Sequence, residues 1–399
     1  MILRRAIRAA LAVTLAASLA CSPGRALVTL NDGHDKIYVS AGLSMSRDSN
    51  VFANSDQRGD YVYATSLSAE YTRRAGWIGV NGSAAVSSSR FATIKGQDFN
   101  NPSFGLEFTK QTGRTTGSLT LSAARESRAD AAVNLRSTSW NIPIGLSFKY
   151  PISGTYTMSG SLGYSSRRYL DETVFASLST YHVGIDLFHI LTTERDVIAG
   201  YRYRYSDTSR HSSSTDHSLS LGLSGRLIRG LAGSLRVGYQ ARMADGLLDA
   251  RGARLGRLTY GSWTASGTAA YPVTKKLQFS AVIAKDFSTT ATDSSVDTTT
   301  FSLDGAYAYS SHWSLGSAMS FGDSRFLGES GRVVLSLGPP LQLGPHRHDN
   351  YLNWSGSLNY SFNEHFRAAL SYSWFKNWST SSYGDFVRSA WSFSTSTRW

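Results

Sequence analysis

Five arginines in the middle of the chain stand where their side chains share one face of predicted strands. Tyr201, Tyr203 and Tyr205 alternate with Arg202 and Arg204, and a β-strand places successive side chains on opposite faces. Two following segments repeat the pattern and add three arginines, which are Arg226, Arg236 and Arg242. Because arginines along one wall of a water-filled passage attract anions, we predict a basic strip on the inner wall of a channel.

The same arginines have a simpler interpretation, in which they pair with inward carboxylates and only fill the interior. A wide barrel interior needs polar filling whatever passes through it. Five acids on the predicted strands are candidate partners, namely Glu70, Glu107, Asp186, Asp286 and Asp304. The sequence leaves both interpretations open.

The final stretch, residues 387–399, alternates with a period of two. Trp391, Phe393 and Trp399 share one face, with small polar residues between them. As the edge of a soluble sheet such a strand would invite aggregation, whereas a barrel pairs its last strand with its first. We therefore predict a closing strand whose apolar face meets lipid. Trp399 is also similar to the C-terminal aromatic signal by which outer-membrane barrels are recognised for assembly.

Similar alternating segments recur from Ile37 onward. Eight short turns alternate with nine long polar loops, which predicts 18 strands, with 16 as the alternative, and places both termini at the short-turn end. A strand-like run at residues 332–337 would make the count odd, so we assign it to a long outer loop at 323–350. We predict an all-β fold, a transmembrane antiparallel outer-membrane β-barrel formed by residues 37–399.

The placement of aromatic residues favours lipid over water as the outer solvent. Each of several short turns is flanked by an aromatic pair, as an interfacial girdle requires. These pairs are Tyr71 with Trp77, Tyr150 with Tyr156, Tyr309 with Trp313, and Phe362 with Phe366. The composition agrees, because 12% aromatic and 17% charged residues with a mean hydropathy of −0.22 suit strands with one apolar and one polar face.

The first 26 residues have the pattern of a signal peptide. A basic start precedes an apolar run, and Gly24-Arg25-Ala26 places small residues where a signal peptidase reads. Lipidation at Cys21, the one cysteine, is the alternative. Residues 27–36 are expected to form a short periplasmic segment. Removing the four arginines of residues 1–26 lowers the formal charge from +12 to +8, and no disulfide is expected in the mature chain.

Other chemistries find little support in the residue pattern. Serines are frequent, but none stands in a nucleophile-elbow context, and His346 and His348 lack the spacing of a zinc site. Basic residues are spread along the chain, so nucleic acid is not an expected partner. We predict no enzyme, and no catalytic residue, cofactor or metal site.

Residues 37–71 resemble the start of the beta-barrel porin 2 family of outer-membrane proteins. The resemblance rests on Asp48-Ser49-Asn50-Val51-Phe52 after the first strand, followed by Asp56 and Asp60. It implies a barrel without an established substrate, in a family often linked to exopolysaccharide export or assembly. Ser49 stands where the family has an acid, so Asx turns are a better expectation here than a cation site.

Together these patterns predict a channel for passage or export of polar, anionic or saccharide solutes across the outer membrane of a Gram-negative bacterium. The alternative is a closed structural or docking barrel whose outer loops bind surface polysaccharide or a partner protein. Expected partners are the lipid bilayer, the barrel-assembly machinery, and polysaccharide or export-system proteins.

Overall fold

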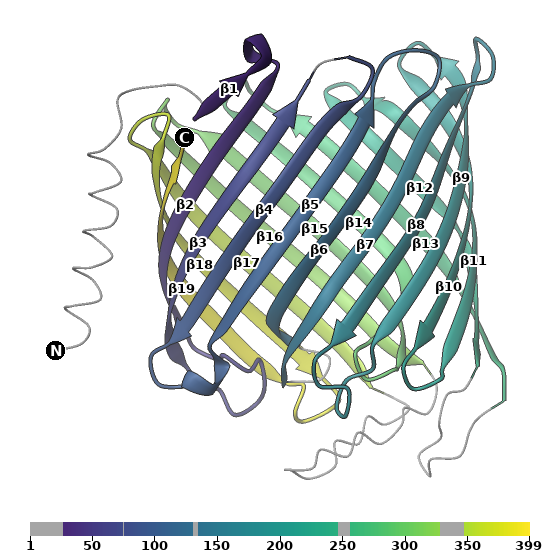
Figure 1. The fold of residues 1–399 in the computed structure, drawn as a ribbon. Coiled ribbons are helices and arrows are strands. Elements are labelled where there is room, and N and C mark those ends of the chain that lie inside the picture. Colours follow the sequence, from purple (N-terminus) through teal and green to yellow (C-terminus); the bar gives the residue numbers. More distant parts are fainter. Residues whose placement is uncertain (1–26, 75, 131–134, 246–255, 328–346) are drawn as a thin grey trace.

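The computed structural model describes residues 27–74, 76–130, 135–245, 256–327 and 347–399. They form one barrel of tilted strands, with short turns at the end that carries the C-terminus and longer loops at the opposite end (Figure 1). The predicted signal peptide, including Cys21, lies outside these residues. None of the described helices is long and apolar enough to cross a membrane.

The described chain contains 19 strands and two 3-10 turns. The first ten strands are β1 (Val28–Leu30), β2 (Asp35–Asp48), β3 (Asp60–Arg73), β4 (Gly79–Phe91), β5 (Phe99–Lys110), β6 (Thr116–Asp130), β7 (Leu135–Pro151), β8 (Tyr156–Tyr169), β9 (Leu178–Thr192) and β10 (Arg195–Thr208). The others are β11 (Ser213–Ile228), β12 (Leu231–Asp245), β13 (Leu258–Pro272), β14 (Leu277–Thr289), β15 (Ser295–Ala308), β16 (Trp313–Leu327), β17 (His348–Ser361), β18 (Phe366–Ser379) and β19 (Phe386–Arg398). The turns are η1 (Asn31–Gly33) and η2 (Lys95–Gln97).

Eighteen of these strands, β2 to β19, close the barrel, as the alternation of short and long connections predicts. Each pairs antiparallel with its neighbours in the sequence, and β19 pairs with β2 from Ala390 opposite Asp48 to Arg398 opposite Ser40. Strand β1 pairs only with the start of β2 and extends the wall at the short-turn end. The fold class is therefore a closed antiparallel 18-stranded β-barrel.

Trp399 completes the closing ladder. Its backbone N–H donates to Val39 O and its carbonyl accepts from Val39 N–H, both at 2.9 Å. The indole stacks on the His365 ring with centroids 4.4 Å apart. The backbone of Trp399 thus fastens the end of the chain to β2, and its side chain fastens it to the β17–β18 turn.

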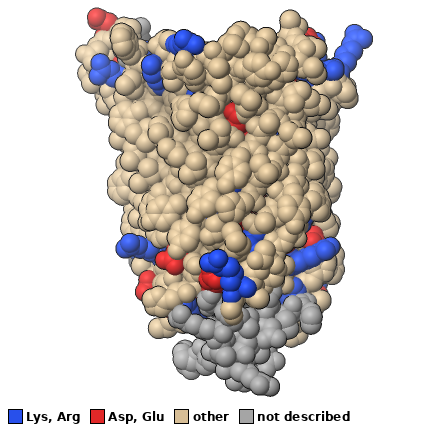
Figure 2. Space-filling view, turned by 90° about the vertical axis from the view of Figure 1, so that its right-hand side faces the viewer, with Lys and Arg blue, Asp and Glu red and all other residues tan. Residues whose placement is uncertain are grey.

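The outer wall is apolar and the inner wall is polar. On β11, Leu219 and Leu221 are 66% and 67% exposed, while Ser218 and Ser220 face the interior. A large apolar surface outside a closed sheet requires an apolar solvent, as lipid provides. Figure 2 agrees, since charged side chains gather toward the two ends of the barrel and leave a largely uncharged band between them.

The strands run further into the predicted loops than the alternation of residues suggests. Of the expected loop 287–298, only residues 290–294 lie between strands, and of 206–216 only 209–212. The boundaries expected for loop 323–350 are also wrong, because β16 continues to Leu327 and β17 begins at His348. Backbone pairing does not depend on a lipid-facing apolar residue, so the ladder continues where the apolar pattern stops. Residues 328–346, with the strand-like run 332–337 and His346, lie outside the described residues.

Candidate functional site

All five arginines of the predicted basic strip lie on β10, β11 and β12. Arg236 pairs with Asp186 at 2.5 Å midway along the wall. Arg226 pairs with Glu194 at 2.7 Å near the short-turn end, where both are exposed. Arg202 is exposed, and no ion pair involves it within the part of the chain that the structure describes. The remaining two lie near the long-loop end.

Arg204 and Arg242 form a charged network with two aspartates. Arg204 donates to Asp216 at 2.7 Å and to Asp286 at 2.8 Å. Arg242 donates to both carboxylate oxygens of Asp216, at 2.7 and 2.8 Å, and their side chains are only 1% and 7% exposed. Buried charges are tolerated when they are paired and hydrogen-bonded in this way. Two positive and two negative groups leave the network without net charge.

The pair of Arg204 and Asp286 shows that the end of β14 has left the wall. Four strand-to-strand steps of about 4.8 Å separate β10 from β14, or roughly 19 Å along the sheet. That distance exceeds what an arginine and an aspartate can bridge. The long-loop end of β14 must therefore lie inside the barrel, against β10 to β12.

The hydrogen-bond ladders show where β14 departs. Its pairing with β13 ends at Ala265 opposite Lys285, so residues 258–264 of β13 and 286–289 of β14 have no mutual pairs. Pairing of β14 with β15 nevertheless continues to Thr289 opposite Ser295. We call residues 286–297, which are the ends of β14 and β15 with the turn between them, the inward ribbon; its β15 side stays paired with β16, from Asp297 opposite Arg325 to Ser295 opposite Leu327.

Side-chain contacts identify the surface on which the inward ribbon rests. Phe287 and Asp297 continue the face of β14 and β15 that carries the exposed Phe279 and Phe301 further along. Phe287, however, is buried beneath the Arg242 guanidinium, 5.2 Å from its ring centroid. Asp297 accepts a hydrogen bond from Ser262 Oγ on β13 at 2.8 Å. The outer face of the ribbon thus packs against the inner face of β12 and β13.

Two backbone carbonyls of the departed segment are bound by the same arginines. Arg204 Nη2 donates to Phe287 O at 2.6 Å, and Arg242 Nη1 donates to Ser288 O at 2.7 Å. Both carbonyls belong to the residues that lack a partner in β13. An exposed edge strand leaves backbone groups without hydrogen bonds. The two arginines therefore replace some of the hydrogen bonds that pairing with β13 would have made.

The ribbon's tip, residues 290–294, reaches the loops on the far side of the network. Ala291 O accepts from the Ala176 N–H at 2.7 Å, and Ala291 packs in a buried cluster with Tyr169 and Phe175, whose rings stack at 5.0 Å. Asp293 accepts a hydrogen bond from Ser212. The β8–β9 and β10–β11 loops therefore hold the tip in place and narrow the long-loop end of the lumen.

We expect the position of this tip to depend on pH through Asp293. Burial raises the pKa of this carboxyl, and neighbouring Asp207 raises it further, against the opposing effects of Ser212, Thr208 and Arg210. A raised pKa means that the docked tip prefers the protonated acid, so docking is strongest in acid and weakens as pH rises through that pKa.

Channel conductance should accordingly increase with pH above the ordinary aspartate range of about 4. Asp293→Asn, which cannot ionise, should keep the tip docked and remove this dependence, while the exposed Asp56→Asn should preserve it. A pH profile unchanged by Asp293→Asn would contradict the assignment.

The residues that carry the family resemblance fasten the first long loop. Asp48 pairs with Arg388 of β19 at 2.6 Å and accepts from the Asn50 N–H at 2.9 Å. The fully buried Asn50 donates to Val387 O at 3.2 Å. Asp60 accepts the N–H groups of Thr93 and Ile94, at 2.9 and 2.8 Å, from the β4–β5 loop. These acids serve loop anchoring, in agreement with the expected Asx turn.

Several residues around the inward ribbon, which we also call the constriction of the lumen, cannot be recognised as site residues from the sequence. Asp216 and Asp297 stand in ordinary alternating segments, and Lys285, which pairs with Asp297 at 2.7 Å, resembles any polar strand residue. The predicted partner Asp286 was identifiable by its inward position, but its contact with Arg204 depends on the departure of β14 from the wall. No group of three potential metal ligands occurs in the described ranges.

Comparisons with known proteins give weak structural similarity only. No family model and no curated protein matches the chain. The FrpB iron transporter from Neisseria meningitidis (F3-3 variant) is 8% identical with a TM-score of 0.47; the match covers 86% of this chain but only 62% of that one. Pseudomonas aeruginosa OccK2 (OpdF), solved with glucuronate, is 11% identical over 91% of this chain and 97% of its own, with a TM-score of 0.47. OccK1 (OpdK) from the same organism is 11% identical over 91% and 99%, with a TM-score of 0.49. At these values the similarity assigns neither a family nor a substrate to this chain.

Proposed function

We propose that the chain is an outer-membrane channel for polar solutes whose width is set by the inward ribbon. The observation that carries the proposal is the inward position of residues 286–297, which narrows a lumen lined by serine, glycine and charged residues. A barrel that served only as a membrane anchor would gain nothing from a ribbon that charged residues hold inside its lumen. The apolar outer wall supports placement in a bilayer.

Charge selection by this channel is expected to be modest. The network of Arg204, Arg242, Asp216 and Asp286 is neutral as a whole, and Arg236 is neutralised by Asp186. Arg202 remains as a basic group on the inner wall. Solutes are therefore polar, with a weak preference for anions or for neutral saccharides. Export of polysaccharide remains a proposal that rests on the beta-barrel porin 2 resemblance alone.

The alternative function is a closed docking barrel, and the packing of the first loop favours it. Val51 in this loop is completely buried, and its carbonyl accepts from Arg136 of β7, whose guanidinium also lies over the Phe91 and Phe99 rings at 5.2 and 5.5 Å. Loops held this firmly could present a fixed surface to a polymer or a partner protein.

Single-channel recording in planar bilayers separates the two functions. A channel should give discrete conductance steps, with an anion-to-cation permeability ratio slightly above unity that falls in Arg202→Gln. Arg226→Gln, which removes a paired and exposed arginine near the short-turn end, is the matched control. Absence of conductance steps from correctly folded protein would exclude the channel and leave the docking barrel, whereas a clear cation preference would reject the proposed selectivity.

A further inference from the structure

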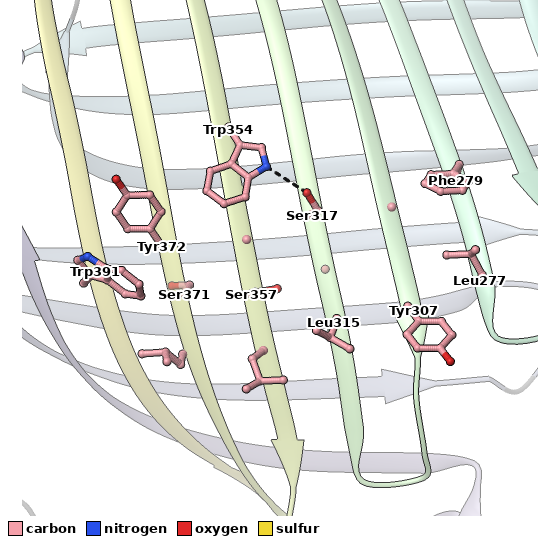
Figure 3. A pocket seen from close by; sticks show the side chains of 15 residues that line it. Leu277, Phe279, Tyr307, Leu315, Ser317, Trp354, Ser357, Ser371, Tyr372 and Trp391 are labelled. Carbon is pink, nitrogen blue, oxygen red and sulfur yellow. Dashed lines mark hydrogen bonds between the residues drawn. The ribbon is translucent and has the colours of Figure 1, made fainter.

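The outer wall of β14 to β19 carries a groove of about 470 Å³ toward the short-turn end (Figure 3). Trp354, Tyr372 and Trp391 form one side, with ring centroids 5.9 and 4.6 Å apart in succession. Leu277 and Phe279 of β14 border the opposite side. The groove therefore lies on the face that meets lipid, well separated from the constriction inside the barrel.

The lining of this groove is mostly apolar. The Trp354 indole N–H donates to Ser317 Oγ at 3.2 Å (Figure 3), which satisfies the indole donor. Gly305 and Gly356 contribute no side chain, and a Cβ added to Gly356 would lie 3.5 Å from the Trp354 ring. A surface of this kind suits a hydrocarbon chain, because a polar ligand would lose its hydrogen bonds there.

A basic turn borders the same groove. Lys275 and Lys276 directly precede Leu277 and are exposed. Lys276 Nζ donates to Tyr309 O at 3.1 Å, and the Tyr309 ring lies 6.3 Å from that of Tyr307, which lines the groove. Turns 273–276, 309–312 and 362–365 stand at this end of the groove and contain only one acid, Glu364. The rim is thus positive where the wall below it is apolar.

We propose that the groove and this turn together bind one anionic glycerophospholipid, with its phosphate at Lys275 and Lys276 and an acyl chain along the aromatic wall. The inference rests on the membrane placement in the proposed function. A neutral lipid would bring no net negative charge to the two lysines. A second copy of this chain, inserted in the same orientation, would bring an equally basic turn to the rim. The anionic lipid matches both the charge and the apolar lining.

Brominated lipids test this site, because bromine on an acyl chain quenches the fluorescence of tryptophans that it contacts. The full chain is reconstituted in phosphatidylcholine vesicles with a small, equal fraction of chain-brominated phosphatidylglycerol or chain-brominated phosphatidylcholine. The two lysines are expected to enrich the anionic lipid at the groove on the order of tenfold. Brominated phosphatidylglycerol should therefore quench more strongly, and Trp354→Phe with Trp391→Phe should remove the excess.

Matched variants locate the effect. Lys275→Gln with Lys276→Gln, and separately Gly356→Leu, should abolish the excess quenching. Lys110→Gln with Arg229→Gln removes two charges from other short turns, and Gly82→Leu fills another part of the outer wall; both should retain it. Equal quenching by the two lipids in the unmodified chain would overturn the site while leaving the membrane channel intact. No quenching by either lipid, including at the exposed Trp263, would overturn the membrane placement and the site together.

Discussion

Replacing both Arg204 and Arg242 with alanine is expected to release the inward ribbon and enlarge the conducting path. The double variant removes every hydrogen bond that these arginines make to Asp216, Asp286 and the ribbon backbone. Arg204 and Arg242 each donate a hydrogen bond from a charged group to the ribbon backbone, and such bonds contribute about 1.5–3 kcal/mol each. Loss of both should shift the balance between docked and released ribbon by a factor on the order of 100. Single-channel recording should show a higher main conductance with fewer closures.

Arg236→Ala is the matched control, because Arg236 lies on the same strand as Arg242 and pairs with Asp186 without contacting the ribbon. It should leave the conductance nearly unchanged. An equal rise in Arg236→Ala would mean that loss of lumen charge, and not release of the ribbon, changes the conductance.

The released ribbon has a defined place to go. Continuing the observed register of β13 and β14 would set Trp263 opposite Phe287, and facing residues of antiparallel strands lie within the Cα distance that a disulfide spans. Trp263→Cys with Phe287→Cys should therefore form a disulfide faster when Arg204 and Arg242 are both alanine. If cross-linking is equally slow with and without the arginines, the ribbon does not rejoin the wall.

Deleting Trp399 is expected to lower the amount of folded barrel in the outer membrane severalfold. The deletion removes two backbone hydrogen bonds to Val39 and the stacking on His365. At about 1 kcal/mol for each hydrogen bond and a similar value for the ring contact, the last residue loses roughly 3 kcal/mol of contacts with β2 and the β17–β18 turn. The predicted assembly signal is lost as well. Heat-modifiable migration of the membrane fraction on gels would measure the folded amount.

Two substitutions separate seam stability from signal recognition. Trp399→Ala keeps the backbone bonds and loses the aromatic ring, whereas Trp391→Ala removes an exposed aromatic residue from the same strand without touching the end. If the ring acts as a signal, Trp399→Ala should resemble the deletion and Trp391→Ala should resemble the unmodified chain. Normal folded levels of the deletion variant would refute both roles.

The sequence alone determined the architecture of this protein. A period of two, with Leu219 and Leu221 on one face and Ser218 and Ser220 on the other, specifies strands whose two faces need different solvents. Eight short and nine long connections specify 18 strands, and the alternation in residues 387–399 specifies a closing strand. These features are local, so strands, their number and the closing strand can be predicted without knowing which residues meet in space.

The sequence predicts strand ends and loop lengths less accurately than the number of strands. The alternation of apolar residues marks where a strand meets lipid, and it ends before the hydrogen-bond ladder does. The residue pattern of 287–289 and 295–297 is therefore typical of a loop, although these residues pair with each other across the two strands. The sequence could not distinguish a loop from a paired ribbon with polar faces.

Only the tertiary structure decided the site. Asp286 and Asp297 occupy ordinary alternating positions. No local pattern in residues 258–264 or 286–289 predicts that β13 and β14 separate there. The departed segment is bound by Arg204 and Arg242, which stand on strands up to four positions away and donate hydrogen bonds to its backbone carbonyls. Such contacts arise because the end of β14 leaves the wall and folds against the inner face of nearby strands, and no periodicity along the chain encodes which inward side chains then meet.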